Sequence, residues 1–200
     1  MKVKVCIITG TPGTGKTVLA KKLGKRLKSR IIFLSELISE ENHILGYDED
    51  RDTSVANFKT LIPRLKELIK NYKKEKNLDL IIIEGHYSDV VPKKLVDYAI
   101  ALRCHPDELN RRLKERDYRD QKIKENIQAE ILSECTTYLI DKDIKAPILE
   151  IDTTAGNFNE IVDNLYKIFV NGSGFEIHEL GKIDWLEEIY EKNRLKEFFD

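Results

Sequence analysis

Hydrophobic positions along the chain form five short continuous runs, separated by stretches in which hydrophobic residues recur every three or four positions. The runs cover residues 3–9, 30–34, 78–85, 97–104 and 147–151. Continuous runs of this length are typical of strands buried on both faces, and the wider spacing is typical of amphipathic helices. The alternation predicts an α/β protein whose parallel sheet carries helices on both faces.

Two of the helical stretches are especially regular. The first, over residues 15–28, has a hydrophobic face made of Val18, Leu19, Leu23 and Leu27. The second, over residues 121–141, repeats a hydrophobic residue every four positions, at Ile123, Ile127, Ile131, Cys135 and Leu139. Between the second and third strands the chain is polar at first, and the pattern predicts a helix from about Asn57.

The last thirty residues form a separate tail. The linker-like sequence NGSG, residues 171–174, separates a core domain over residues 1–170 from a helical extension over residues 171–200. Hydrophobic residues of the tail cluster at Trp185, Leu186, Ile189 and Tyr190, and again at Phe198 and Phe199. Exposing so much aromatic surface favours aggregation, so we expect one or two helices that pack on the core. The alternative is a helix that binds a partner.

The composition changes this picture only by exclusion. Lys and Arg number 34 against 35 Asp and Glu, so no net charge draws the chain to nucleic acid or to a membrane surface. The three cysteines, Cys6, Cys104 and Cys135, form no close pair, which argues against a disulfide framework or a zinc site. No run approaches the roughly 18 apolar residues of a membrane span, and the first residues lack the pattern of a signal peptide. We therefore expect a cytoplasmic protein.

The sequence GTPGTGKT, residues 10–17, lies between the first strand and the first helix. It satisfies the pattern G-x-x-x-x-G-K-[ST], in which backbone N–H groups of a glycine-rich loop surround phosphate oxygens. Lys16 is expected to reach the β- and γ-phosphates, and the Thr17 hydroxyl is placed to bind Mg²⁺. The following helix adds its positive N-terminal end. The alternative, a glycine-rich turn with an exposed lysine, does not explain the strand before it and the helix after it. The ligand is therefore a nucleoside triphosphate.

The third strand ends in the sequence IIIEGHYSD, which carries two candidate site residues. Glu84 stands at the carboxyl end of a parallel strand, where proteins of this kind hold the hydration shell of Mg²⁺. A capping or ion-pairing carboxylate is the alternative. His86 follows at the same edge, where it either orients water or the phosphoryl acceptor or has only a structural role.

Cations gather after the fourth strand, at Arg111, Arg112, Lys114, Arg116 and Arg119. One interpretation is a solvated helix with pairs such as Asp107 with Arg111 and Asp120 with Lys124. The other is a lid that brings Arg116, and with it Arg119, onto the transferring phosphates.

The segment between the second and third strands is acidic over residues 40–52, which would repel a second nucleotide's phosphate. Arg51 and Arg64 are the cations nearby. The segment is therefore either a solvated loop or a flap over the acceptor nucleotide. The scarcity of cations favours weak kinase activity accompanied by ATP hydrolysis.

Four sequences together resemble the CINAP-type adenylate kinases, small P-loop proteins connected with ribosome assembly. They are GTPGTGKT, EENHILGYDED, EGHYSDVVP and RLKERDYRDQKIKENIQAEI, and they fall within residues 5–135. The resemblance implies the nucleoside-monophosphate-kinase fold with strand order 2-3-1-4-5, an acceptor-binding region over residues 33–56 and a short lid over residues 115–125.

The resemblance also implies roles for single residues. The ATP phosphates would be lined by Gly13, Thr14, Gly15, Lys16, Thr17 and Val18. Arg116 would be the lid arginine, and His86 a histidine that takes part in turnover. The family usually has glycine where this chain has Asp117, and often has aspartate where it has Glu84.

The expected activity is the Mg²⁺-dependent reaction of ATP with AMP to give two ADP. The resemblance further implies a role in small-subunit maturation, with a ribosomal protein of the small-subunit platform as partner and a contact with precursor ribosomal RNA. Two alternatives stay open. One is an ATPase switch with little kinase activity, and the other is a small-molecule kinase with another acceptor.

Overall fold

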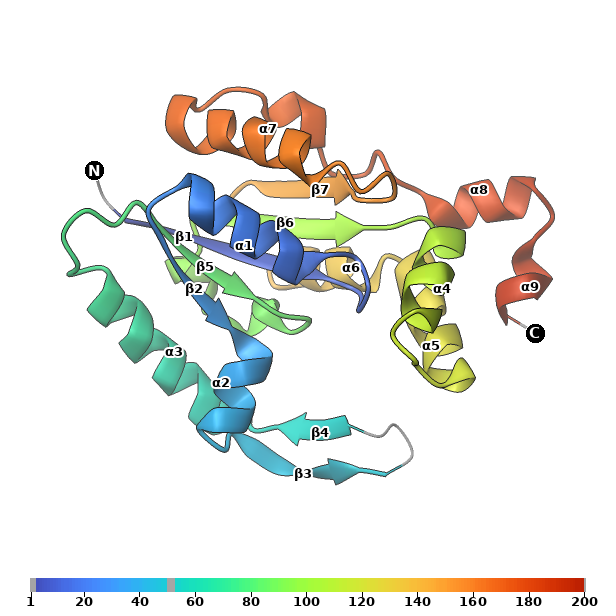
Figure 1. Cartoon of the computed structure of the whole chain (residues 1–200), viewed down its shortest axis with the longest axis horizontal. Coiled ribbons are helices and arrows are strands. Elements are labelled where there is room, and N and C mark those ends of the chain that lie inside the picture. Colours follow the sequence, from blue (N-terminus) through green and yellow to red (C-terminus); the bar gives the residue numbers. More distant parts are fainter. Residues whose placement is uncertain (1–2, 50–52, 200) are drawn as a thin grey trace.

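A five-stranded parallel sheet lies at the centre of the computed structural model, which describes residues 3–49 and 53–199 (Figure 1). Its strands are β1 (Lys4–Gly10), β2 (Ser29–Phe33), β5 (Leu80–Glu84), β6 (Tyr98–Arg103) and β7 (Ile148–Asp152). They lie in the order β2-β5-β1-β6-β7. Counted along the five strands predicted from the sequence, this is the order 2-3-1-4-5, so the predicted fold class is confirmed.

Helices cover both faces of the sheet (Figure 1). On one face, α1 (Lys16–Arg26) packs beside α7 (Phe158–Asn171); α3 (Phe58–Tyr72) and α6 (Glu134–Asp141) cover the other. Because successive side chains of a strand point to opposite faces, β1 contributes to two cores. Val5 and Ile7 pack into one core, and Cys6 and Ile8 pack into the other.

The predicted helix over residues 121–141 is two helices, α5 (Asp120–Ile131) and α6. The chain breaks at Ser133, which adopts a left-handed conformation with φ of 56°. A repeat of four residues advances by about 40° per step on a helix of 3.6 residues per turn, so one straight helix cannot point the whole stripe inward. The break keeps all five stripe residues, from Ile123 to Leu139, buried.

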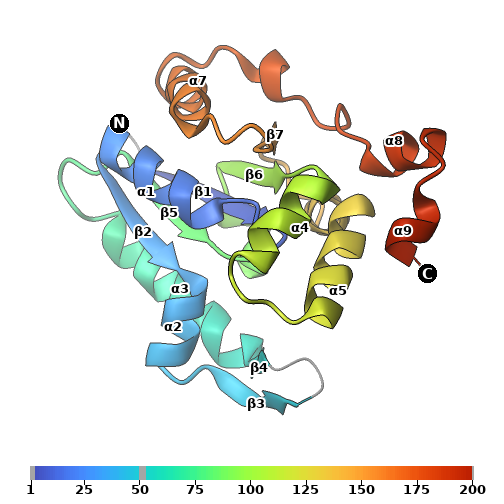
Figure 2. The same cartoon turned by 45° about the vertical axis from the view of Figure 1, so that its right-hand side comes forward.

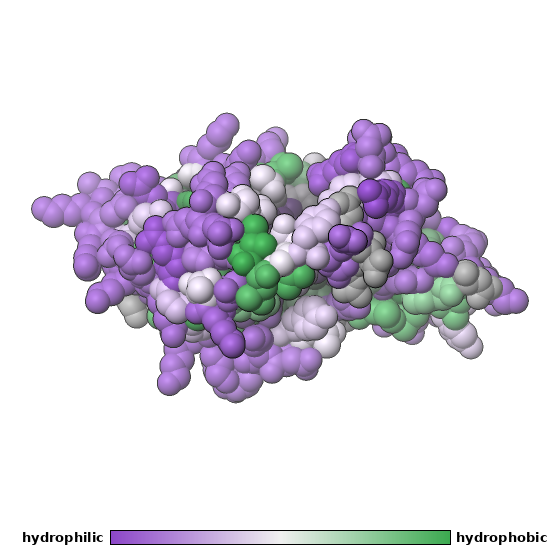
Figure 3. Space-filling view, turned by 90° about the horizontal axis from the view of Figure 1, so that it is seen from below, coloured by the Kyte–Doolittle hydropathy of each residue, from purple (hydrophilic) through white to green (hydrophobic). Residues whose placement is uncertain are grey.

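A hairpin that the sequence pattern did not predict follows β2 and α2 (Leu34–Glu40). It consists of β3 (Ile44–Asp48) and β4 (Thr53–Ala56), which pair antiparallel. The hairpin projects from the sheet (Figure 1). The molecule seen from below has a group of hydrophobic residues near the middle of that face (Figure 3). The large hydrophobic residues that the hairpin exposes are Leu45, Tyr47 and Val55.

The tail packs on the core and ends in two short helices. The last two helices of the chain are α8 (Trp185–Glu191) and α9 (Leu195–Phe199). Three short 3-10 helices lie earlier in the sequence, η1 (Ser88–Val90), η2 (Lys93–Leu95) and η3 (Phe175–His178). Figures 1 and 2 show α8 and α9 beside α4 (Pro106–Lys114) and α5. Ile189 and Phe198 are buried in one cluster with Leu109, Leu113 and Ile127. No helix in residues 3–49 and 53–199 is long and apolar enough to cross a membrane.

Candidate active site

The glycine-rich loop turns between β1 and α1 at the carboxyl edge of the sheet. Gly13 and Gly15 have φ of 95° and 93°, a region that side chains rarely adopt. A Cβ atom on Gly15 would lie 2.3 Å from Cζ of Phe158, and one on Gly13 would lie 2.7 Å from Cδ1 of Leu109. The loop thus needs glycine at both positions, and it packs directly on α7 and α4.

Lys16 reaches back over the loop. Its Nζ donates to the carbonyl oxygens of Gly10, at 2.8 Å, and Thr11, at 3.2 Å. Burial lowers the pKa of Lys16, while the carboxylate of Glu84 acts in the opposite direction. The ammonium group is therefore held at the mouth of the loop, where a triphosphate would replace the two carbonyls as its partners.

Thr14 closes the turn of the loop. Its hydroxyl donates to the carbonyl of Thr11 at 2.8 Å, and its own carbonyl accepts from the hydroxyl of Thr153 at 2.8 Å. Arg112 was not singled out as a site residue, yet it supports the same loop. It donates to the carbonyls of Thr153, at 2.7 Å, and Gly13, at 3.4 Å. Nothing in the local arginine cluster distinguished this residue from its neighbours.

Thr17 and Glu84 form the candidate magnesium site. The Thr17 hydroxyl donates to Oε2 of Glu84 at 3.2 Å, and the pairing of Ile8 with Glu84 in the sheet brings the carboxylate beside the loop. Burial raises the pKa of Glu84, and a cation would offset that cost. Among the described residues no three His, Cys, Asp or Glu side chains gather as metal ligands. Mg²⁺ commonly binds through one or two protein oxygens, substrate phosphates and waters, so this oxygen pair fits it.

His86 lies beside the loop and lines the cleft. Its Nδ1 is 3.4 Å from the carbonyl oxygen of Gly10 and 3.6 Å from Sγ of Cys135. Burial lowers the pKa of His86, and the charge of Lys16 lowers it further. The ring is therefore neutral at neutral pH. If Nδ1 carries the proton toward Gly10, Nε2 carries the free lone pair.

One cleft of about 470 Å³ brings most of the predicted site residues together with residues of the segment expected to bind the acceptor. Glu84, His86, Arg116 and Tyr118 line it, together with residues of α2 and the hairpin. From the latter come Leu34, Ser35, Ile38, Ser39, Ile44, Thr53, Ser54 and Ala56. The loop contributes Pro12, Gly13, Gly15, Lys16 and Thr17, whereas Thr14 is not among the lining residues. Val18 lines it too. Arg119 is not among the lining residues.

The arginines after β6 differ in their surroundings: one lines the cleft, and another forms ion pairs on the helix surface. Arg116 lines the cleft, and Asp117 beside it has φ of 55°. Arg111 pairs with Glu108 and Glu115 on the helix surface, so the expected pair of Asp107 with Arg111 is wrong. Asp107 instead accepts two hydrogen bonds from Arg194 of the tail, at 2.8 and 2.9 Å, and these bonds help to fix the tail.

The segment expected to bind the acceptor brings few cations to the cleft among the described residues. Arg64 donates to both carboxylate oxygens of Glu41, at 2.7 and 2.8 Å, and to Glu67 at 2.9 Å. It does not line the cleft. Arg51, the other candidate, lies outside the described residues. Within the described residues, the cations that line the cleft are Lys16 and Arg116.

A glycine-rich loop with its lysine, a hydroxyl–carboxylate pair and a parallel sheet of this order define a P-loop protein with the fold of the nucleoside monophosphate kinases. The chain belongs to the family described as "AAA domain", whose sequence profile matches residues 6–133, and groups with archaeal proteins named "Putative adenylate kinase". The relative from Methanosarcina acetivorans is 36% identical over 190 residues, which cover 91% of this chain and 97% of the relative. The relative from Methanocaldococcus jannaschii is 35% identical, with 92% and 94% covered.

Solved structures show the same fold at low sequence identity. Thymidylate kinase from Candida albicans superposes with a TM-score of 0.56 at 14% identity, over 87% of this chain and 94% of that chain. Shikimate kinase from Bacteroides thetaiotaomicron gives a TM-score of 0.51 at 18% identity, over 82% and 97%. At these identities the likeness concerns the fold alone.

Proposed function

We propose that the protein is a Mg²⁺-dependent adenylate kinase that converts ATP and AMP into two ADP, with slow hydrolysis of ATP as a side reaction. The observation that carries this proposal is the single cleft that holds the phosphate-binding loop, Arg116 of the lid and the acceptor region formed by α2 and the hairpin. The names of the archaeal relatives support the same activity.

The reaction breaks the bond between Pγ and the oxygen bridging to Pβ, and forms a bond between Pγ and an oxygen of the AMP phosphate. Negative charge spreads over the transferring group, so positioning and charge stabilisation do most of the work. Lys16 would leave the carbonyls of Gly10 and Thr11 for the β- and γ-phosphates, and Arg116 would approach from the lid. Thr17 and Glu84 would hold Mg²⁺, which neutralises charge on the phosphate oxygens when bound.

His86 is assigned to orienting the attacking group. A neutral ring with Nδ1 toward Gly10 leaves Nε2 able to accept a hydrogen bond from water. The same lone pair could accept the proton of a monoprotonated AMP phosphate. The hydroxyl groups of Ser35, Ser39, Thr53 and Ser54 supply neutral donors for the acceptor nucleotide.

ATP hydrolysis is the second candidate function, and the acceptor side favours it. Arg64, on α3, is held by two glutamates and does not line the cleft. The described residues of α2 and the hairpin that line the cleft include no cation for a second phosphate. Water needs no such cation. An ATPase switch that acts with a ribosomal protein or with precursor ribosomal RNA in small-subunit maturation is supported only by the sequence resemblance.

A nucleotide panel tests both candidates. ATP consumption is measured alone and with AMP, GMP, CMP or UMP, and the products are separated. Adenylate kinase activity predicts two ADP for each ATP used with AMP, and a much lower rate of phosphate release without an acceptor. Release of phosphate at the same rate with and without AMP would favour the ATPase. Transfer to GMP, CMP or UMP and not to AMP would show that the acceptor is another nucleoside monophosphate.

A further inference from the structure

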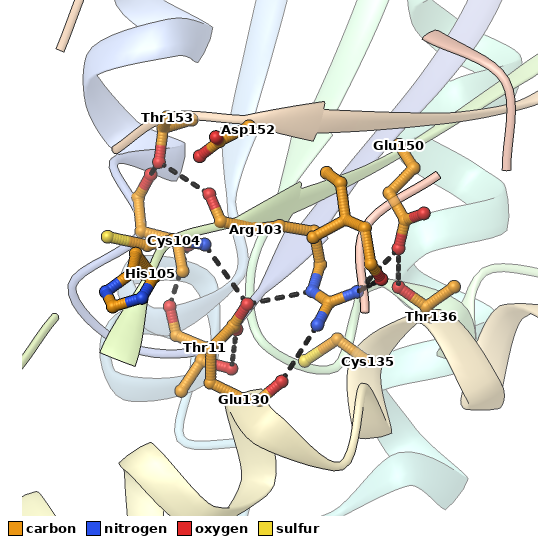
Figure 4. A network of polar contacts seen from close by, with 12 residues as sticks. Thr11, Arg103, Cys104, His105, Glu130, Cys135, Thr136, Glu150, Asp152 and Thr153 are labelled. Carbon is orange, nitrogen blue, oxygen red and sulfur yellow. Dashed lines mark hydrogen bonds and ion pairs between the residues drawn. The ribbon is translucent and has the colours of Figure 1, made fainter. Parts of the chain in front are cut away.

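A buried polar network connects the phosphate-binding loop with α5, β6 and β7 (Figure 4). Arg103 is at its centre and is only 1% exposed. Its Nε donates to Oε1 of Glu130 at 2.8 Å, and its Nη1 donates to Oε1 of Glu150 at 2.6 Å. None of these three side chains lines the cleft, and the reaction described above uses none of them.

Glu130 reaches the loop through one hydroxyl group. The Oγ1 of Thr11 donates to Oε2 of Glu130 at 2.6 Å, and the backbone N–H of Cys104 donates to Oε1 at 3.1 Å. With Arg103, three donors meet this carboxylate. Burial raises the pKa of Glu130, while the Arg103 guanidinium, the Thr11 hydroxyl and the N–H of Cys104 act in the opposite direction. A hydrogen bond to a buried carboxylate is stronger than one between neutral groups.

Thr11 is the second residue of the loop, and its backbone organises the turn. Its carbonyl accepts from Nζ of Lys16 and from the hydroxyl of Thr14. Its own side chain is 1% exposed and does not line the cleft. A fixed Thr11 side chain therefore fixes the peptide on which the lysine rests.

We propose that Glu130 is a positioning residue that holds the phosphate-binding loop in its nucleotide-binding conformation through the hydroxyl of Thr11. The inference rests on the proposed function, since it assigns Glu130 to the ATP site of that reaction. A loop held in its binding conformation has less freedom to lose when ATP binds, which raises affinity. Glu130 lies on α5, the helix that follows the lid loop, so the same carboxylate ties the lid's support to the loop.

The alternative is that the bond between Thr11 and Glu130 only stabilises the fold. A similar bond elsewhere in the network allows the two explanations to be separated. The hydroxyl of Thr136 donates to Oε1 of Glu150 at 3.2 Å. Thr136 is 5% exposed and donates to the second carboxylate of the network, but it does not contact the loop. Removing the charge of Glu130 itself would leave Arg103 short of a partner, so the hydroxyls are the better targets.

The test compares Thr11→Val with Thr136→Val in the full chain. Affinity for a non-hydrolysable ATP analogue is measured by calorimetry, and thermal stability by melting. Thr11→Val should weaken binding by about 10-fold, since a bond to a charged group is lost, and Thr136→Val should weaken it less than about 2-fold. Thr11→Ser should restore most of the affinity. Equal losses of affinity in the two valine variants, or a Thr11→Val protein that melts earlier but binds normally, would overturn the inference.

A second measurement does not depend on ATP. Amide resonances of Gly13 and Gly15 are compared by NMR in the nucleotide-free proteins. They should move in Thr11→Val and stay in place in Thr136→Val. If the wild-type chain fails to bind the analogue, the proposed function is wrong, and the resonances still decide the inference. Unchanged resonances in Thr11→Val, or equal changes in both variants, count against it.

Discussion

The two sides of the cleft are built in opposite ways. On the proposed nucleotide side, the loop joins a buried strand to a helix. Arg112 and Thr153 donate to its carbonyl groups, and its own Thr11 donates to Glu130. On the acceptor side, α2 is short, and the hairpin exposes Leu45 and Tyr47 to solvent.

This difference indicates where specificity and rate arise. A site built on rigid elements with satisfied polar groups is ready for its ligand, whereas a solvent-exposed hairpin gives weaker and more adaptable binding. We therefore expect large effects from substitutions on the nucleotide side and small effects from those on the acceptor side.

The largest effect is expected from Lys16→Ala. It removes the ammonium group from the β- and γ-phosphates, and a transition-state charge contact of this kind is worth about 3–4 kcal/mol, or about 10²–10³ in rate. The fold should survive, since the side chain bonds only to loop carbonyls. The measurement is kcat for phosphoryl transfer, with Lys25→Ala, on the exposed end of the same helix, as control. Full turnover in a folded Lys16→Ala protein would end the assignment.

The nucleotide side was predictable because its signal is local. Gly10 to Thr17 are consecutive, and the strand before and helix after them follow from short patterns. Glu84 and His86 followed from the rule that sites lie at the carboxyl ends of parallel strands. The sheet order came from the resemblance to a family and not from the hydrophobic runs themselves.

What escaped prediction depends on contacts between distant segments. Thr11 and Glu130 are 119 residues apart, and nothing in either local sequence pairs them. The hairpin was missed because its strands are short and expose most of their side chains, so they show neither the alternation of a half-buried strand nor the continuous hydrophobic run of a buried one. The break at Ser133 was missed because hydrophobic residues at every fourth position resemble one face of a single helix. Only the rotation of this stripe around the helix axis, about 40° per step, shows that a straight helix cannot bury all of it.

A smaller effect is expected from His86→Gly. ATP affinity should stay nearly intact, since loop backbone groups make most phosphate contacts, while turnover falls about 10-fold or more through loss of positioning. Calorimetry with ATP and measurement of ADP formation separate the two quantities. Parallel losses of affinity and rate would make His86 a binding or structural residue.

The pH profile gives an independent reading of the same residue. Burial lowers the pKa of His86 from its ordinary value of 6.5, so the ring is neutral near pH 7 and gains a proton only at lower pH. Turnover should therefore be level through the neutral range and fall as pH drops below that range. Glu84 also gains a proton on the acid side, because burial raises its pKa, and saturating Mg²⁺ should oppose that step. The His86→Gly variant should lose the first of these two steps.

The lid is expected to give a still smaller effect, through Asp117. Asp117 follows the cleft-lining Arg116. Its negative charge would repel a bound triphosphate, and solvent and salt weaken that repulsion. Asp117→Asn keeps a residue type that tolerates φ of 55°, and Asp117→Gly adds freedom as well. Both should lower KM for ATP about 2-fold if charge dominates. A change confined to the glycine variant would assign the effect to backbone freedom instead.

The smallest effect is expected from Arg64→Ala, on the acceptor side. Three hydrogen bonds to Glu41 and Glu67 engage its guanidinium, and they raise the pKa of Arg64 and lower that of Glu41. For Arg64 to hold an acceptor phosphate, these bonds would have to break. KM for AMP should therefore change less than about 2-fold, and stability should change little, since pairs this exposed contribute little to it.

Glu41→Gln sharpens the same test, because it weakens the bidentate pair and leaves Arg64 freer to move. If the arginine is merely a surface partner, KM for AMP stays constant in both variants. If KM rises about tenfold in Arg64→Ala, which corresponds to about 1.4 kcal/mol, and falls in Glu41→Gln, the arginine swings onto the acceptor phosphate during turnover. The acceptor side would then be a site assembled by the substrate, and Glu41 the group that competes with AMP for its cation.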